Sequence, residues 1–499
     1  MIRSLIIFIF SFSFFVSEAQ YQYDFNQNCR DAYSSVISLK FEEGNRLIQA
    51  EKKANPNNNI PYLIENYIYF LTVFIGEKET DFDEMEDLHD EVIDRLKDGD
   101  ESSPFYRYSL AQANLQWAFV RTKFKEYVTA TMEINRAYRL LEDNNEEFPD
   151  FLPNKINLGL LHTLIGTIPD KYNWIKKMVG IEGTVNQGTG EILEVLDASL
   201  KSDEYGIYKA ECLFYLSFIQ LNLSADKKKA LDYIDLINAD EKNATPNPLI
   251  VYAMSRIYMS NGMNDKAIDL LLSRPLTKDY YPFHYLDYLT GLAKLQRLDK
   301  DADIYFKKYL SEFEGINYIK AAYQKIAWHN LVFGSTEKYK EYIAKVEDNG
   351  NDIIDADKQA EREAEKNEAP NPVLLKARVA FDGGYYEKAL TELTGPNRNF
   401  LVTSKDSLEY SYRIGRVYDG MEKPMQAMAF YKMTIKNGAG SEYYFAANSA
   451  LKTGIIYEKQ GDKEQAAIYY RKAMNMENKE YKNSIDQKAK AGLNRVEND

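Results

Sequence analysis

Small and aromatic residues recur at fixed spacings in the last part of the chain, and this pattern restricts the fold more than any other feature. In GIIYEKQGDKEQAAIYYRKAM, residues 454–474, Gly454 precedes Ala466 by twelve residues, with Gly461 between them and Tyr470 beyond. Residues three or four apart share one helical face, so the stretch predicts two helices joined by a turn. Antiparallel helices approach closely only where side chains are small, which places Gly454 and Ala466 at the crossing.

The same pair of small residues recurs in earlier copies. The further pairs are Gly415 and Ala427, Ala377 and Ala389, Ser255 and Ala267, and, one residue closer together, Gly291 and Ala302. Copies roughly 34 to 40 residues apart are typical of a solenoid in which each helix pair packs on the next. We therefore expect an all-α fold, a right-handed solenoid of helix pairs.

The last copy resembles the tetratricopeptide repeat (TPR) family. The matching small and aromatic positions are Gly454, Tyr457, Ala466, Tyr470 and Ala473. Ala450 stands where that family has a tryptophan and Asn478 where it has a proline. The resemblance covers residues 371–475, and more loosely 247–310. It implies a scaffold that binds protein or peptide partners and has no enzymatic activity.

Residues 159–196 resemble a segment of a eukaryotic TPR family linked to the mitochondrial outer membrane and to clearance of protein inclusions. The shared features are a helix, a turn at Pro169 and closely spaced glycines before the next helix. The resemblance carries no catalytic motif. It supports an all-helical N-terminal half, whose amphipathic stretches indicate degenerate helix pairs.

The chain begins with the features of a secretory signal peptide. Arg3 precedes the apolar run 5–16, which is too short to span a bilayer comfortably, and Ser17 and Ala19 are small residues before a cleavage site. A retained N-terminal anchor is the alternative. Residue composition rich in Lys, Asn, Ile and Tyr suits a bacterium. We therefore expect secretion across an inner membrane to a periplasmic or outer-membrane-associated location, with any association with the outer membrane made through a partner.

These features divide the chain into five parts. They are a signal peptide (1–19), an N-terminal helical domain (20–200), a central TPR-like array (201–350), a connecting helix (351–370) and a C-terminal TPR array (371–499). The connecting part is rich in Ala, Glu and Lys and ends near Pro370, which predicts a solvated helix followed by a break.

Charge and cysteine content limit the class of partner. A net charge of −14 argues against a protein that tracks nucleic-acid phosphates, so we expect no nucleic-acid partner. Of the two cysteines, Cys212 lies in an apolar helical pattern and is expected as a buried thiol, and Cys29 is expected to be exposed. A disulfide between them is the alternative, since exported proteins can form one.

No motif indicates catalysis, a cofactor or a metal. The run Gly183–Gly190 lacks the lysine of a phosphate-binding loop, so its glycines are expected to serve a turn. His89 lies among acidic residues, which favours a solvated helix face over a calcium site. We found no G-x-S-x-G elbow and no C-x-x-C pair. The chain is therefore predicted to have no catalytic residue, cofactor or bound metal.

The inner face of such an array is formed by the first helix of each pair, and basic and aromatic residues gather there. The expected groove residues are Arg378, Phe381, Tyr412, Arg413, Arg416, Asn448 and Lys452. They can hold an extended peptide or a carboxylate terminus. The alternative is that these are ordinary surface charges paired with Glu409, Asp419 and Glu458.

Two other functions remain open from the sequence. A hydrolase on a helical toroid requires paired carboxylates surrounded by aromatic side chains. A small-molecule-binding scaffold requires a closed apolar pocket.

Overall fold

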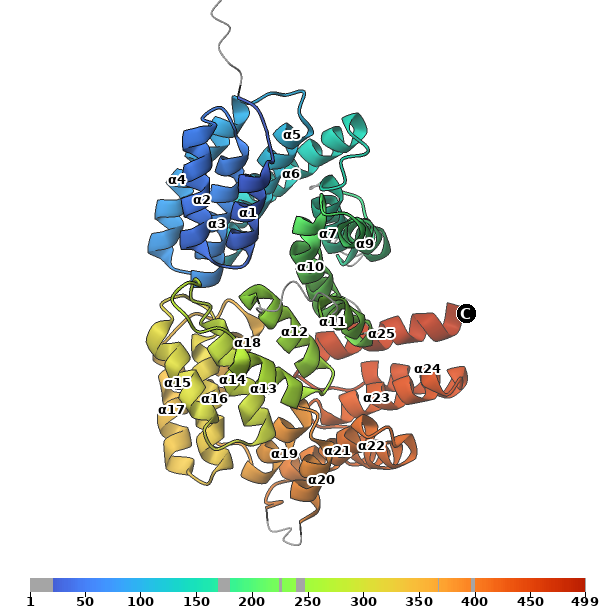
Figure 1. Ribbon diagram of the computed structural model, residues 1–499. Coiled ribbons are helices and arrows are strands. Elements are labelled where there is room, and N and C mark those ends of the chain that lie inside the picture. The colour runs from blue at the N-terminus through green and yellow to red at the C-terminus, as the bar shows by residue number, and fades with distance from the viewer. Residues whose placement is uncertain are drawn as a thin grey trace, which may run out of the picture. The chain divides into compact units, whose positions relative to one another are not determined.

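The computed structural model is built from helices (Figure 1). It describes residues 21–168, 180–223, 227–238, 247–366, 368–395 and 400–498. Within these ranges the only extended pairing is two isolated β-bridges, made by Tyr21 and Gln22. The predicted all-α fold is confirmed. The predicted signal peptide and Pro169 lie outside the described residues. No described helix is both long and apolar enough to cross a membrane.

The chain forms two compact units. The first comprises the described residues up to Ile75, then Glu79–Cys212 and Thr277–Tyr281. The second comprises Gly76–Lys78, Leu213–Leu276 and the described residues from Pro282 onward. The division after Cys212 falls inside a helix, twelve residues beyond the boundary expected at residue 200. The second unit contains most of the predicted central array and all described residues of the predicted C-terminal array.

The first unit contains the degenerate helices of the N-terminal half. They are α1 (Gln27–Ile37), α2 (Phe41–Ala54), α3 (Ile60–Gly76), α4 (Glu79–Lys97), α5 (Pro104–Lys123), α6 (Tyr127–Glu147), α7 (Asn154–Gly166), α9 (Val185–Lys201) and the start of α10 (Lys209–Asn222). Neighbouring helices α1 and α2, α5 and α6, and α7 and α9 pack as pairs.

The second unit is a succession of helix pairs. Its helices are α11 (Ala230–Asn238), α12 (Pro248–Ser260), α13 (Asn264–Ser273), α14 (Tyr285–Arg297), α15 (Ala302–Glu312), α16 (Ile319–Val332), α17 (Thr336–Asp348), α18 (Asp355–Glu365), α19 (Pro372–Asp382), α20 (Tyr386–Thr394), α21 (Ser404–Gly420), α22 (Pro424–Gly438), α23 (Phe445–Lys459), α24 (Lys463–Met474) and α25 (Lys482–Asn498). The pairs are α12 with α13, α14 with α15, α16 with α17, α19 with α20, α21 with α22, and α23 with α24, and α25 packs on the last of them.

Where the two helices of a pair cross, the sizes of the two facing residues complement each other. A Cβ on Gly454 would lie 2.8 Å from the ring of Tyr470, and one on Gly415 would lie 2.6 Å from the ring of Tyr431. Both tyrosines are fully buried. In the corresponding positions of the α19–α20 pair, Ala377 faces the smaller Leu393, and both are buried. Glycine therefore accompanies an aromatic ring, and alanine accompanies leucine.

The turn between the two helices of each repeat uses a left-handed residue. Seven positions after the first small residue, φ is +70° at Gly262, +82° at Gly384 and +80° at Gly461. Glu422 and Leu298 occupy the same position with φ of +58° and +67°. The turn geometry is thus kept where glycine, the residue best suited to it, is absent.

Helix α18 is packed rather than solvated on one side. Asp357, Ala360 and Ala364 are buried, and Asp357 accepts hydrogen bonds from the backbone N–H groups of Tyr318 (2.7 Å) and Ala321 (2.8 Å). The helix predicted for the connecting segment is confirmed, but the expectation that it is solvated is wrong for this face. The carboxylate of Asp357 accepts hydrogen bonds from N–H groups at the start of α16 that have no partner within the helix.

The glycine run before α9 allows two helices to cross closely. A Cβ on Gly188 would lie 2.1 Å from the carbonyl oxygen of Gly159, and one on Gly183 would meet the backbone of His162. The α9 N-terminus is capped by Thr184, whose side chain accepts from the N–H of Gln187. These glycines serve close packing of α7 on α9, as well as the turn that the sequence analysis expected.

Both cysteines are buried free thiols. The expectation for Cys212 is confirmed, and the expectation that Cys29 is exposed is wrong, because α1 buries it against Asn58. Burial, followed by the charges of Glu51 and Asp24, raises the pKa of Cys29 to about 12. A thiol held neutral in this way is a poor nucleophile.

His89 lies inside the first unit and not on a solvated face. Its ring is stacked on Trp117 at 4.6 Å between centroids, and Nδ1 lies 2.7 Å from Oδ1 of Asn66. Burial, followed by the positive charge of Arg121, lowers the pKa of His89 to about 3. The imidazole is therefore neutral at physiological pH and belongs to the core.

Candidate functional site

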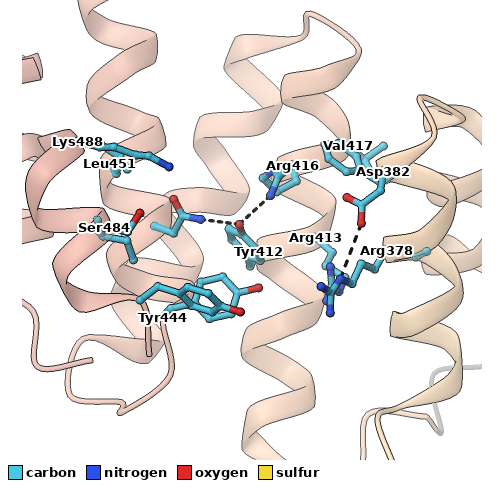
Figure 2. A pocket seen from close by; sticks show the side chains of 15 residues that line it. Arg378, Asp382, Tyr412, Arg413, Arg416, Val417, Tyr444, Leu451, Ser484 and Lys488 are labelled. Atoms are coloured by element: carbon cyan, nitrogen blue, oxygen red, sulfur yellow. Dashed lines mark hydrogen bonds and ion pairs between the residues drawn. The ribbon is translucent and has the colours of Figure 1, made fainter. Parts of the chain in front are cut away.

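A pocket of about 240 Å³ lies on the first-helix side of the C-terminal repeats. Figure 2 shows the side chains that line it. They come from four successive segments: Ala377, Arg378, Phe381 and Asp382 of α19; Tyr412, Arg413, Arg416 and Val417 of α21; Tyr444, Asn448 and Leu451 at the start of and on α23; and Tyr481, Ser484, Ile485 and Lys488 at the start of and on α25.

Helical periodicity explains why these residues meet. On each helix the lining residues, some of them adjacent pairs, recur after three or four positions, so they form one stripe along the helix. The small residues of the crossings hold each first helix close to its own second helix, and α19, α21, α23 and α25 contact one another in turn. The stripes consequently lie side by side and enclose the pocket.

The hydroxyl of Tyr412 is the polar centre of the pocket. It accepts a hydrogen bond from Nη1 of Arg416 at 3.0 Å and another from Nδ2 of Asn448 at 2.8 Å. The Tyr412 side chain is itself buried, 1% exposed. Arg416 also lies over the ring of Phe381, with Cζ 4.4 Å from the ring centroid. These contacts fix the direction of the Arg416 guanidinium (Figure 2).

Positive charge outweighs negative charge at the pocket. Arg413 pairs with Glu409, where Nε and Oε1 are 2.7 Å apart, and Arg378 lies 3.9 Å from Asp382. Arg416 and Lys488 have no carboxylate within ion-pair distance among the described residues. Four cations thus face two carboxylates, in a protein whose formal net charge is −14. Such a site attracts an anionic group.

Burial and this positive charge together lower the pKa of two neighbouring lysines. Burial, followed by the charge of Arg416, lowers the pKa of Lys452. Burial, followed by the charge of Arg378, lowers the pKa of Lys325 to about 7. The ammonium group of Lys325 also lies over the ring of Trp328, 3.6 Å from its centroid, and Arg378 lies over the same ring at 4.8 Å. The basic region therefore extends from α16 to α25.

The structure brings together six of the seven residues that the sequence placed in the groove. Lys452 is the exception, since it does not line the pocket and lies 3.9 Å from Asp419. The pairs Arg413–Glu409 and Lys452–Asp419 are those that the surface-charge alternative expected, whereas Glu458 pairs with Arg495. Arg416 has no carboxylate partner among the described residues, so the surface-charge alternative does not account for it.

Sequence reasoning missed the residues that close the pocket. Tyr444 directly precedes α23, and Tyr481, Ser484 and Lys488 lie at the start of or on α25, beyond residue 475, where the repeat around Gly454 was taken to end. An available signal was the spacing of Ile485, Ala489 and Gly492, which gives α25 an inward face.

One group of potential metal ligands occurs among the described residues. His284, Asp287 and Glu312 each present a ligand atom within 4.8 Å of the others. However, Asp287 is paired with the guanidinium of Arg274, and Lys308 lies 3.3 Å from it. Two protein cations already neutralise the buried carboxylate, which leaves little charge to hold a metal ion.

No protein-family model and no curated protein sequence matches the chain. Among solved structures, it is similar to the TPR domain of P58(IPK) at 13% identity, over 87% of this chain and 97% of that one, with a TM-score of 0.22. It is similar to the APC/C hetero-tetramer Cut9-Hcn1 at 12% identity, over 93% and 95%, also with a TM-score of 0.22. Scores this low carry no weight for arrangement or function, so the helix-pair architecture stands on the helices and contacts of this chain.

Proposed function

We propose that the protein is a non-enzymatic scaffold that binds an acidic segment of a protein partner in the pocket formed by α19, α21, α23 and α25. The observation that carries this proposal is Arg416, a fixed guanidinium that faces the pocket without a carboxylate partner among the described residues. An acidic side chain or a terminal carboxylate of the partner supplies the missing charge.

The shape and lining of the pocket favour a peptide segment. Tyr412, Tyr444 and Tyr481 supply flat apolar surface beside the cations, and Tyr481 is 50% exposed. Aromatic and arginine side chains of this kind contribute most of the binding energy at many protein interfaces. The stripe of each helix offers one contact point, so an extended segment can touch several repeats at once.

The two alternative functions receive less support from the lining residues. The pocket has Asp382 as its carboxylate, and Arg378 lies beside it, so the lining does not supply the paired carboxylates that a glycoside-type hydrolysis needs. The lining is also strongly charged, unlike the closed apolar pocket expected for a small-molecule carrier.

We place this activity outside the bacterial cytoplasm. The support is the N-terminal sequence, with Arg3, the apolar run 5–16 and the small residues before Gln20. A role in envelope assembly or secretion machinery follows from that location, with any association with the outer membrane made through the bound partner.

The test compares two lysines on one helix. Lys488 and Lys490 are both exposed on α25, but only Lys488 lines the pocket. A photo-crosslinking amino acid replaces Tyr481 in the wild-type background and in the Lys488→Glu and Lys490→Glu backgrounds, and partners are captured from envelope extract. We expect one crosslinked partner with wild type and with Lys490→Glu, and its loss with Lys488→Glu.

Arg416→Gln provides a second, charge-removing variant, with folding checked by circular dichroism. Equal capture by wild type and by both pocket variants, Lys488→Glu and Arg416→Gln, would place the interface elsewhere and contradict the proposal. Residues 1–19 still attached in the mature protein, as measured by mass spectrometry, would contradict the cleaved signal peptide on which this location rests.

A further inference from the structure

A row of alternating cations and aromatic rings crosses the first helices of three successive pairs, α16, α19 and α21. Arg416 on α21 lies over the ring of Phe381, with Cζ 4.4 Å from the ring centroid. One helical turn earlier on α19, Arg378 lies over the ring of Trp328 at 4.8 Å. Lys325 on α16 lies over the same ring, with Nζ 3.6 Å from its centroid. The row therefore continues from the pocket lining, to which Arg378 belongs, to Lys325.

Glu363 of α18 is held by neutral donors and forms no ion pair with Lys325. It accepts hydrogen bonds from Nε1 of Trp328 at 2.7 Å, from the hydroxyl of Tyr339 at 3.1 Å and from Nε2 of Gln324 at 2.8 Å. The amide of Gln324 is thereby oriented so that its oxygen accepts from Nζ of Lys325 at 2.6 Å. Within the part of the chain that the structure describes, Lys325 has no carboxylate within ion-pair distance. The network consequently fixes the ring and the ammonium group without pairing the lysine with an acid.

Arg378 is only loosely paired. Its Nε lies 3.9 Å from Asp382, which is longer than a charge-assisted hydrogen bond, and its side chain is 30% exposed. Figure 2 shows these two side chains beside each other at the pocket. Trp328, over which both Arg378 and Lys325 lie, is buried, so its ring holds the two cations near each other. Two neighbouring cations without a close carboxylate attract an acidic group.

We propose that Lys325 and Arg378 form a second subsite, which binds a second carboxylate of the acidic segment that occupies the pocket. This inference rests on the proposed function, since the segment is the one that reaches Arg416. Ammonium and guanidinium groups each carry several N–H donors, and a carboxylate has two oxygens that accept from both. The bound segment is therefore acidic at two separate positions, one in contact with Arg416 and the other in contact with Lys325 and Arg378.

The experiment titrates the full-length protein with two peptides and measures their affinities by ligand-observed NMR. Both peptides consist of glycine and serine with blocked ends. One carries a single glutamate, and the other carries a second glutamate whose position is varied along the peptide. The affinity for the single-glutamate peptide tests the proposed function, and the ratio of the two affinities tests the second subsite. In wild type we expect the second glutamate, at its best position, to increase the affinity at least about tenfold.

Two variants separate the subsites, and a third is the control. Lys325→Met should remove most of the increase and leave the affinity for the single-glutamate peptide unchanged. Arg416→Gln should weaken the binding of both peptides. Lys376→Met should leave the ratio as in wild type, because Lys376 is 31% exposed, like Arg378, but pairs with Glu392 at 2.8 Å and lies outside the pocket lining.

The pH dependence of the ratio is a readout that a merely structural role of Lys325 would not produce. Burial and then the charge of Arg378 lower the pKa of Lys325 to about 7, against the opposite influence of Glu363, Asp382 and Asp357. Lys325 is charged below this pKa, so the wild-type ratio should be higher at pH 6 than at pH 8. The ratio of Lys325→Met should not change in this way. Burial raises the pKa of Asp357 to about 6, but this group is present in both proteins, so the difference between them reports on Lys325.

The two proposals fail in different ways. Equal ratios in wild type and Lys325→Met would overturn the second subsite while the proposed function stands, as would a second glutamate that does not strengthen binding to wild type. A single-glutamate peptide that does not bind, or whose binding Arg416→Gln leaves unchanged, would contradict the proposed function and this inference with it.

A variant with stronger binding guards against effects of misfolding. Asp382→Asn removes the acid that lies beside Arg378, so it should strengthen binding of the two-glutamate peptide, a change that loss of folding does not produce. Weaker binding by Asp382→Asn would overturn the inference. Circular dichroism checks the folding of each variant, and if Lys325→Met does not fold, Lys325→Gln takes its place.

Discussion

The hydroxyl oxygen of Tyr412 accepts a hydrogen bond from the side-chain amide of Asn448 at 2.8 Å, and this bond joins the first helices of two successive repeats. The same oxygen accepts from Arg416. One phenol thus connects the packing of the array to the orientation of the guanidinium in the pocket.

Removing the Tyr412 hydroxyl should lower the stability of the folded protein. Tyr412→Phe leaves the amide of Asn448 and the guanidinium of Arg416 without this acceptor, so we expect a loss of about 1–3 kcal/mol in the free energy of unfolding. Denaturation in urea measures it. Tyr443→Phe is the control, because its hydroxyl makes no hydrogen bond with the described residues, and its effect should stay within about 0.5 kcal/mol. Equal effects of the two variants would contradict the role given to Tyr412.

The match between glycine and aromatic residues predicts a coupled pair. Gly454→Ala places a methyl group against the ring of Tyr470 and should destabilise the protein by about 1–3 kcal/mol. Combining it with Tyr470→Leu reproduces the alanine–leucine pair of Ala377 and Leu393. The double variant should be more stable than the sum of the single effects predicts, by about 0.5–3 kcal/mol. Strict additivity in a double-mutant cycle would refute the size match. Gly440→Ala, at a position with open space, is the control.

The left-handed turn at Glu422 offers a stabilising change. Its φ is +58°, and its side chain is 86% exposed, so it contributes little packing. Glu422→Gly relieves the steric conflict of a Cβ in this conformation and should raise the free energy of unfolding by about 0.5–1 kcal/mol. The melting temperature should rise correspondingly. A decrease would show that the wild-type side chain stabilises the turn in another way.

The carboxylate of Asp357 should be structural. Asp357→Ala leaves the N–H groups of Tyr318 and Ala321 unpaired at the start of α16, with an expected loss of about 1–3 kcal/mol. Asp355→Ala, on the exposed side of α18, should change stability by less than about 0.5 kcal/mol. Hydrogen exchange at the N-terminus of α16 provides a local readout. Unchanged protection there in Asp357→Ala would contradict the assignment.

The neutral His89 predicts a specific acid sensitivity. Its folded-state pKa of about 3 lies below the ordinary value of 6.5, so the unfolded chain binds a proton that the folded protein does not. The stability contributed by this group is present above pH 6.5 and is lost as the pH falls toward 3. His89→Gln places an amide beside Asn66 that can hydrogen-bond but does not titrate, so the stability of this variant should vary less with pH. Urea denaturation between pH 4 and pH 7 compares the two, and parallel profiles would contradict the prediction.

Repeated local patterns made much of this structure predictable. The spacing of Gly454, Ala466 and Tyr470 predicted the helix pairs, because the contacts within a pair join residues close in sequence. The same periodicity predicted that Tyr412, Arg413 and Arg416 share one helical face. These conclusions require only the 3.6-residue repeat of a helix and the close approach that small residues permit.

Contacts between helices distant in sequence were decided by the tertiary structure. The sequence alone did not indicate that α25 brings Lys488 to the pocket, that α18 buries Asp357 or that Trp117 covers His89. Burial and charge pairing depend on which faces of different repeats meet. A pattern within one helix specifies the composition of its face, but only the packed array determines which groups that face contacts and which charges remain unpaired.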